Sequence, residues 1–427
     1  MAQAEADCIK GSLEFNLFLV KRSLNFFSPF PALPLLSSGT LSMKNISLLL
    51  LLVSIYSFSC SSPIGKIFDK KTPHEEYAED LDDRGLDKTP EGRAWLAASE
   101  AALQSPVAVS LPYRQQGYFH ADKPRAIGLQ FTAKAGEKLS FVLARKGKAS
   151  LPIYADIFRQ GDVSAPLLSV DTASSEFSID SEESGTYILR LQPELFRSGE
   201  YSLAVSVGPS LGFPVSGNKA SVGSVWGDDR DGGKRRHEGI DIFAPKLTPA
   251  IAAADGYITG VREGGIGGKT VWLRPEGKNY TLYYAHLDKQ LVHDGQQVKK
   301  GEVVGLVGNT GNAQFTPSHL HFGVYTFNGA INPLPFVNRA IKTAPSIADK
   351  KLTYQLRLTK TQKMSDGNVV KAATQLVPLA VDAKGYLAEA PDGKLVQVPF
   401  NVVQITKEPV KRMDGFAANK AEKLPQS

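Results

Sequence analysis

Residues 237–321 hold five of the seven histidines of this chain, and four of the five lie in three short motifs. The motifs read HEGID at 237–241, YYAHL at 283–287 and HLH at 319–321. Neutral imidazoles, sometimes with one carboxylate, are the ligands of catalytic zinc, which keeps one further position open for water. Both cysteines lie within the first 60 residues, so a metal site in the folded part must use His, Asp or Glu.

The HLH motif continues into residues 322–325 with the alternation typical of a strand that has one buried face. Side chains two positions apart on a strand share a face, so His319 and His321 are predicted to enter one pocket while Leu320 packs behind them. Either both histidines bind one metal, or one binds while the other acts as an acid or base. The spacing leaves both alternatives open.

The HEGID motif requires a bend if its two polar ends are to meet. In a straight strand His237 and Asp241 would stand roughly 13 Å apart, too far for one ion at about 2 Å from each ligand. Gly239 is the position at which the chain can turn. We therefore predict a bend at Gly239 that brings the imidazole and the carboxylate together.

His286 lies in a second alternating segment, residues 281–287. A lone histidine in such a strand is usually structural, so its candidacy depends on the histidines around it. Alternation places Tyr284 on the same strand face, where it is a candidate contact to a substrate or a transition state. His293 lies in a turn-like segment and is expected to be exposed.

Outside the histidine region, the chain divides into several predicted units. At 427 residues it is too long for one ordinary domain, and about two to four are expected. Short strand-like runs between polar turns predict a mainly β, multidomain protein. We predict a jelly-roll-like β-sandwich at 106–208, a glycine-rich β-domain with the histidines at 211–340, and a small SH3-like β-barrel at 346–410. The tail at 411–427 is expected to be flexible.

The N-terminal part reads as a targeting segment followed by a tether. Residues 43–60 start with a lysine near Met43, continue with an apolar run of signal-peptide length, and end with small residues before Cys60. This resembles a bacterial lipoprotein signal in which Cys60 becomes lipidated; an ordinary cleaved signal peptide is the alternative. Residues 1–42 are interpreted as an extension upstream of the true start. Residues 61–105 are predicted to be a charged tether with two short helices, with His74 at its surface.

The net charge of the chain indicates which classes of partner to expect. The net charge of +6 is modest for this length and suits work near an anionic polymer or surface. The sequence has no concentrated basic helix and no alternation of basic and aromatic residues, so nucleic acid is not expected as a partner.

Taken in order, the motifs resemble the lysostaphin-type, or LytM-like, zinc metallopeptidases that cut peptidoglycan. The order is His-x-x-x-Asp, then Tyr-x-His-Leu, then a glycine-rich run, then His-Leu-His-Phe. Further similarities are WG at 226–227, RDGG at 230–233, AADG at 253–256, GQQVKKG at 295–301 and GNTG at 308–311. The resemblance covers residues 211–335, near a third of the chain.

The resemblance implies a role for each motif residue. His237, Asp241 and His321 would bind one Zn²⁺. His286 and His319 would orient and polarise the attacking water and stabilise the tetrahedral intermediate. The implied activity is that of a zinc metalloendopeptidase that hydrolyses peptide cross-links of bacterial peptidoglycan. The bond cut stays open, although the lack of a recognisable module that targets glycine bridges favours direct cross-links.

Two other functions are compatible with the same region. Some members of the family lose metal ligands and instead bind and activate other cell-wall hydrolases, so a silent or latent regulator is the alternative. The intact ligand set favours the enzyme. A small-molecule metallohydrolase is a third hypothesis, which nothing in the flanking regions supports. Whether the protein is the endopeptidase or the regulator, we expect it in the cell envelope, exported and lipid-anchored to a membrane facing the wall.

Overall fold

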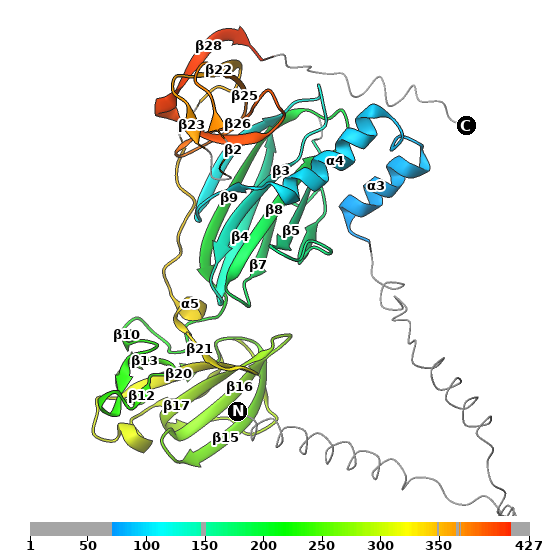
Figure 1. Cartoon of the computed structure of the whole chain (residues 1–427). Helices are drawn as coiled ribbons and strands as arrows, with labels where there is room; N and C mark the ends of the chain where they lie inside the picture. Colours follow the sequence, from blue (N-terminus) through cyan, green and yellow to red (C-terminus); the bar gives the residue numbers. More distant parts are fainter. Residues whose placement is uncertain (1–70, 147–150, 348–349, 364–366, 368, 411–427) are drawn as a thin grey trace, which may run out of the picture. The chain divides into compact units, whose positions relative to one another are not determined.

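The computed structural model describes residues 71–410, apart from 147–150, 348–349, 364–366 and 368 (Figure 1). The predicted extension at 1–42, the signal segment ending at Cys60 and the tail at 411–427 lie outside the described residues, so these interpretations stay predictions. Within the described part of the chain, no helix is long and apolar enough to cross a membrane.

Two helices open the described chain, α3 (Pro73–Asp83) and α4 (Pro90–Gln104). Each follows a threonine whose side chain accepts a backbone N–H from the first turn, and each starts with a proline, whose missing N–H costs nothing there. At α3 the Glu75 carboxylate also accepts the Thr72 N–H, which completes a capping box. The two predicted helices between 61 and 105 are therefore confirmed.

The surface position expected for His74 is wrong. Its side chain is only 5% exposed. The imidazole stacks on Trp95 at 4.7 Å between ring centroids, and its Nε2 lies 2.8 Å from Gln192 Oε1. The sequence predicts the helix α3 but not its packing partners, and it is the packing against α4 and the following β-domain that buries this residue.

The burial of His74 predicts a loss of stability in acid. Burial, and then the nearby charge of Arg190, lower the pKa of His74 to about 4. In the unfolded chain the pKa of His74 is near 6.5, so between about pH 6.5 and 4 the unfolded chain binds a proton that the folded protein does not bind. The free energy of unfolding is therefore highest near neutral pH and falls by about 3 kcal/mol as the pH drops through this range. Urea unfolding at pH 7 and pH 4.5 should show this loss reduced in His74→Gln and unchanged in His293→Gln. An equal acid loss in wild type and His74→Gln would contradict the assignment.

Residues 107–209 form two facing sheets. The strands are β1 (Val107–Ala108), β2 (Tyr113–Phe119), β3 (Ile127–Ala133), β4 (Glu137–Lys146), β5 (Ile153–Arg159), β6 (Leu168–Val170), β7 (Glu176–Asp180), β8 (Gly185–Pro193) and β9 (Gly199–Pro209). One sheet has the order β1-β3-β8-β5-β6, and the other contains β2-β9-β4-β7. Inward-pointing side chains of both sheets, such as Leu139, Leu143, Leu189 and Leu203, are fully buried between them. The two sheets thus bury one core, as a β-sandwich does.

The C-terminal strands extend the second sheet of this sandwich. They are β22 (Tyr354–Leu358), β25 (Gln375–Asp382), β26 (Gly385–Glu389), β27 (Leu395–Pro399) and β28 (Val403–Pro409), whereas β23 (Gln362–Lys363) and β24 (Val369–Val370) pair in a two-stranded sheet of their own. β25 pairs antiparallel with β2, so the sheet runs β27-β26-β25-β2-β9-β4-β7. The predicted SH3-like barrel therefore shares a sheet with its neighbour, and its boundary at 346 stays a prediction.

The histidine region is built on a sheet of its own. Its elements are β10 (Ser221–Ser224), β11 (Asp229–Arg230), β12 (Arg235–Arg236), β13 (Ile240–Phe243), β14 (Pro249–Ile251), β15 (Gly256–Gly264), β16 (Gly268–Pro275), β17 (Tyr280–Gln290), β18 (Gln297–Val298), β19 (Val303–Val307), β20 (His319–Thr326), β21 (Gly329–Ile331) and the short helix α5 (Leu334–Val337). The central order is β10-β13-β20-β17-β16-β15-β18. Leu320 and Phe322 are fully buried, as the alternation predicts. The chain is mainly β, as expected.

Candidate metal centre

Strand pairing brings the three motifs to one place. β13 and β20 pair with Asp241 directly opposite His321, and β20 and β17 pair with Ala285 opposite the same histidine. The register is held by the apolar side chains on the other face. A slip of one residue would turn Leu320 out of the core and both histidines of β20 into it.

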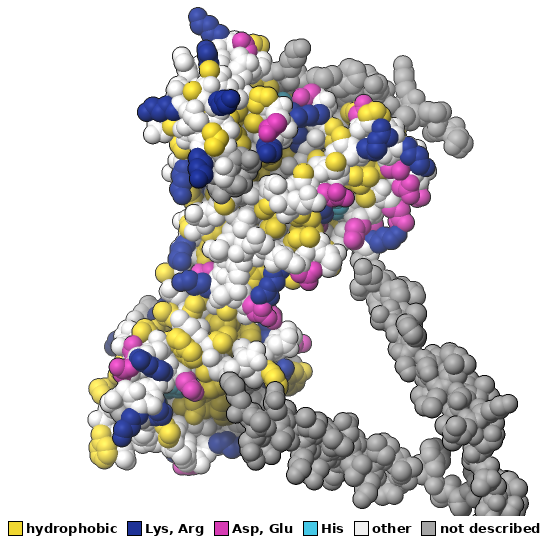
Figure 2. Space-filling model, viewed as in Figure 1, with side chains coloured by type: hydrophobic (Ala, Val, Ile, Leu, Met, Phe, Trp, Pro, Cys, Tyr) yellow, Lys and Arg dark blue, Asp and Glu magenta, His cyan; other side chains and the backbone are white. Residues whose placement is uncertain are grey.

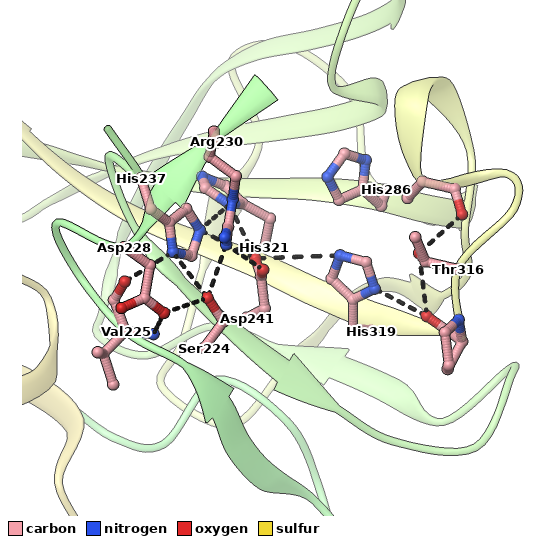
Figure 3. A network of polar contacts seen from close by, with 12 residues as sticks. Ser224, Val225, Asp228, Arg230, His237, Asp241, His286, Thr316, His319 and His321 are labelled. Carbon is pink, nitrogen blue, oxygen red and sulfur yellow. Dashed lines mark hydrogen bonds and ion pairs between the residues drawn. The ribbon is translucent and has the colours of Figure 1, made fainter. Parts of the chain in front are cut away.

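The side chains of His237, Asp241 and His321 converge (Figure 3). His237 Nε2 lies 3.0 Å from His321 Nδ1, and each nitrogen lies 3.1 Å from Asp241 Oδ1. Tetrahedral ligands at about 2.0 Å from a zinc ion stand about 3.3 Å from one another. Two imidazole nitrogens and one carboxylate oxygen at this spacing therefore form a set that can hold one zinc-sized ion.

Hydrogen bonding fixes how His237 presents its nitrogens. Its Nδ1–H donates to the Val225 carbonyl at 2.9 Å. This leaves Nε2, the nitrogen that faces Asp241 and His321, as the one that a metal would bind. A metal-binding histidine commonly has its second nitrogen anchored in this way, which sets both its tautomer and the direction of its ring.

Asp241 lies in a largely enclosed setting, with 12% of its side chain exposed. Burial by itself would raise the pKa of this carboxyl, but hydrogen bonds with His237 and His321 outweigh burial and hold the pKa well below its ordinary value. The side chain is therefore a carboxylate, the form that binds a cation. Its second oxygen, Oδ2, accepts a hydrogen bond from Arg230 Nη2 at 2.8 Å.

His286 and His319 lie beside these three residues. The Nδ1–H of His286 donates to the Thr310 carbonyl at 2.9 Å, and that of His319 donates to the Pro317 carbonyl at 2.8 Å. Each Nε2 is thus left as a proton acceptor, and the His319 Nε2 lies 3.9 Å from Asp241 Oδ1. Burial, followed by the neighbouring histidines, lowers the pKa of His286 to about 4, so this imidazole is neutral at neutral pH.

The backbone at His286 breaks the alternation of β17. His286 has a φ of 61°, in the left-handed region that non-glycine residues seldom adopt, and its N–H donates to the Gly267 carbonyl. Such strain is concentrated at functional sites. It turns the imidazole towards His319, with 5.0 Å between their ring centroids.

This break makes the prediction for Tyr284 wrong. Tyr284 is fully buried, its ring packs against Phe322, and its hydroxyl accepts the Ala253 N–H. The prediction counted back two positions from His286 along a regular strand, but the alternation is interrupted between them. The neighbouring Tyr283 instead shares the face of His321, with 5.9 Å between the two ring centroids.

The chain bends at Gly239, as predicted, but the glycine is needed for a second reason. Its φ is not among the positive values of this chain, so a side chain would not be strained by the backbone. A Cβ at this position would instead lie 2.6 Å from His321 Cε1 and 2.6 Å from the Phe322 carbonyl oxygen. The absence of a side chain lets the HEGID motif approach β20 closely.

We therefore expect Gly239→Ala to weaken metal binding by displacing His321. The added methyl group has backbone on one side and the ligand ring on the other, so the ring must move by several tenths of an ångström. We expect zinc affinity to fall by about tenfold or more, which is the loss usually seen when a residue that orients a metal ligand is changed. Competition with a chromogenic chelator measures it, and Gly185→Ala, with no positive φ and its nearest neighbouring atom 3.7 Å from the added Cβ, tests the effect of a Gly→Ala change alone. An unchanged affinity in Gly239→Ala would show that the ring is free to move.

Two further residues contact the candidate ligands, and no motif of the sequence assigned them this place. Arg230 was noted only as part of the resemblance, and Ser224 was not noted. Ser224 Oγ accepts a hydrogen bond from Arg230 Nη2 at 2.6 Å and lies 3.3 Å from His237 Nδ1. No spacing rule predicts them, because strand pairing sets Ser224 opposite Asp241.

The residues of the centre are recessed. His237, His286 and His319 are each less than 8% exposed. On the face drawn in Figure 2, histidine appears only as small patches, and basic and acidic side chains are interspersed. His293, by contrast, is exposed, as expected.

Comparison with known proteins identifies the class of this domain. Residues 235–333 match the family model "Peptidase family M23". An uncharacterized metalloprotease of Haemophilus influenzae is 37% identical over 157 residues, which are 36% of this chain and 32% of that protein. The peptidoglycan DD-endopeptidase ShyA of Vibrio cholerae is 35% identical over 98 residues, 23% of this chain and 22% of that protein. The chain thus spans about a third or less of the length of these relatives.

The catalytic domain of lysostaphin from Staphylococcus simulans is 31% identical in the aligned part, which covers 27% of this chain and 90% of that domain, with a TM-score of 0.25. From the family match and the relatives together, this chain carries a Peptidase M23 domain.

Proposed function

We propose that this protein is a zinc metalloendopeptidase that hydrolyses peptide cross-links of bacterial peptidoglycan. The observation that carries the proposal is the convergence of His237 Nε2, Asp241 Oδ1 and His321 Nδ1 at ligand spacing, with two further imidazoles beside them. This arrangement supplies both a metal site and groups that can exchange protons with a substrate.

Zinc held by the three ligands would lower the pKa of a bound water to about 7 and polarise the scissile carbonyl. His286 and His319 each present an Nε2 that can accept a proton from the attacking water and return it to the leaving amine. Because both rings are anchored through Nδ1 to backbone carbonyls, they need little reorganisation during the reaction. No side chain is required as a nucleophile, so the reaction needs no covalent enzyme intermediate.

The substrate class rests on the relatives. ShyA is named a peptidoglycan DD-endopeptidase and is 35% identical to this chain over 98 residues. We extend this to a cell-wall substrate here and favour a direct cross-link as the bond. A location in the cell envelope follows from that substrate, and lipidation at Cys60 would anchor the protein to a membrane that faces the wall.

Digestion of cross-linked sacculi tests the proposal. The full chain and His237→Ala would each be incubated with sacculi and Zn²⁺, and the released muropeptides identified by mass spectrometry. We expect cross-linked dimers to disappear with the wild type alone, and the products name the bond. A wild type that binds zinc yet cuts nothing would overturn the enzyme and favour the regulator, which should then stimulate a separate wall hydrolase.

A further inference from the structure

The two oxygens of the Asp241 carboxylate have different partners. Oδ1 faces His237 Nε2 and His321 Nδ1, both at 3.1 Å. Oδ2 is bound on the other side by Arg230 Nη2 at 2.8 Å. A carboxylate without such a partner can rotate and bind an ion through either oxygen or through both, so the arginine restricts this freedom.

We propose that Arg230 is a positioning residue. By holding Oδ2 of Asp241, it leaves Oδ1 as the oxygen that binds the metal and so keeps the coordination by this carboxylate monodentate. The inference rests on the proposed metal site and adds a residue to which no role has been assigned. With Oδ2 bound to Arg230, a zinc ion would have three protein ligand atoms and a fourth tetrahedral position free for water.

Arg230 is itself held in place, as a positioning residue must be. It lies on β11, which pairs with β12 in a tight hairpin directly before His237. The same Nη2 that binds Asp241 also donates to Ser224 Oγ at 2.6 Å, and that hydroxyl donates to Asp228 Oδ2 at 2.8 Å. The Arg230 side chain is 30% exposed, so its charge is partly solvated and its bond to Oδ2 is directional.

The same network reaches the first ligand. Ser224 Oγ lies 3.3 Å from His237 Nδ1, and the adjacent Val225 carbonyl accepts the proton of that nitrogen. One segment, residues 224–230, therefore supports two of the three ligands (Figure 3). Partners of this kind typically change metal affinity by about 10–100-fold when they are removed.

Two effects of Arg230 oppose each other, and their balance can be measured. Its positive charge repels a cation, whereas its hydrogen bond fixes the ligand oxygen. Screening by solvent weakens the repulsion at a partly exposed site, while the hydrogen bond acts at contact distance. We therefore expect the orienting effect to prevail and removal of the guanidinium to weaken metal binding.

The test uses the full chain with three variants. Arg230→Met removes the guanidinium and keeps the aliphatic stem, and Arg230→Lys restores charge and one donor. Arg236→Met is the matched control, because Arg236 is a nearby exposed arginine paired with Asp229, which is not a ligand. Zinc affinity is measured by competition with a chelator, and coordination is read from the visible absorption of Co²⁺, which is strong for four ligands and weak for five or six.

We expect Arg230→Met to lose about 10–100-fold in zinc affinity and to weaken the Co²⁺ absorption, with partial rescue in Arg230→Lys and no change in Arg236→Met. Unchanged thermal unfolding of the metal-free proteins would show that the effect is not a general loss of structure. Equal or tighter zinc binding by Arg230→Met, or an unaltered Co²⁺ spectrum, overturns the inference and leaves the proposed function standing. Failure of the wild type to bind zinc would overturn both.

Discussion

Replacing His321 by alanine is expected to abolish both zinc binding and cleavage of peptidoglycan. His321 Nδ1 lies within 3.1 Å of both other donor atoms, so its loss removes a ligand from the centre of the set. Two remaining ligands, one of them a carboxylate already bound to Arg230, cannot complete a tetrahedral site. We expect zinc affinity to fall by more than about 100-fold, because substitution of a residue that only orients a ligand can already lower metal affinity that far. Metal content after dialysis, measured by atomic absorption, and release of muropeptides from sacculi are the two readouts.

The control for this prediction is His293→Ala, because His293 is an exposed histidine of the same domain and is not among the three converging residues. It should retain zinc and activity. The fold of His321→Ala should persist, since Leu320 and Phe322, the neighbours that pack into the core, are untouched. A His321→Ala protein that keeps one zinc per chain and cleaves sacculi at the wild-type rate would contradict the assignment of the ligand set.

Replacing His286 by alanine is expected to separate chemistry from metal binding. The His286 side chain is not hydrogen-bonded to any of the three candidate ligands, and its Nδ1–H donates to the Thr310 carbonyl. Zinc content should therefore stay at one per chain. Turnover should fall by about 10²–10⁴-fold, the usual contribution of a positioned acid or base. Steady-state cleavage of a purified cross-linked muropeptide, together with zinc content, gives both quantities.

His319→Ala provides a comparison within the same prediction. Its ring is adjacent to that of His286, but its Nε2 also approaches Asp241, so a modest loss of zinc should accompany the loss of turnover. The double variant should lose less than the product of the two single losses if both rings act on one proton. Loss of zinc from His286→Ala as complete as from His321→Ala would place His286 among the ligands instead.

A large part of the site could be predicted from the sequence because it depends on local periodicity. Alternation around HLH placed two histidines on one strand face, and burial of Leu320 and Phe322 confirms that face. The distance between His237 and Asp241 along an extended chain required a bend at Gly239, which the structure has. These inferences need only the geometry of a strand and the size of a metal site.

The errors come from features that no local pattern encodes. The positive φ at His286 interrupts the alternation of β17, so Tyr284 lies in the core and Tyr283 lies beside His321. His74 is buried because α3 packs against residues far away in the sequence, among them Gln192. The C-terminal strands share a sheet with the sandwich because β25 pairs with β2, more than 250 residues earlier.

The motifs and their periodicity were enough to predict which side chains can bind a metal and which strand faces they occupy. Which of these side chains meet, and in what orientation, depends on how distant segments pair. Strand order across β10, β13, β20 and β17 sets Ser224, Asp241, His321 and Ala285 side by side, and the hairpin before His237 delivers Arg230 to the far oxygen of Asp241. The physical reason is that ligand geometry depends on contacts between distant segments, whereas periodicity reports only on neighbours along the chain.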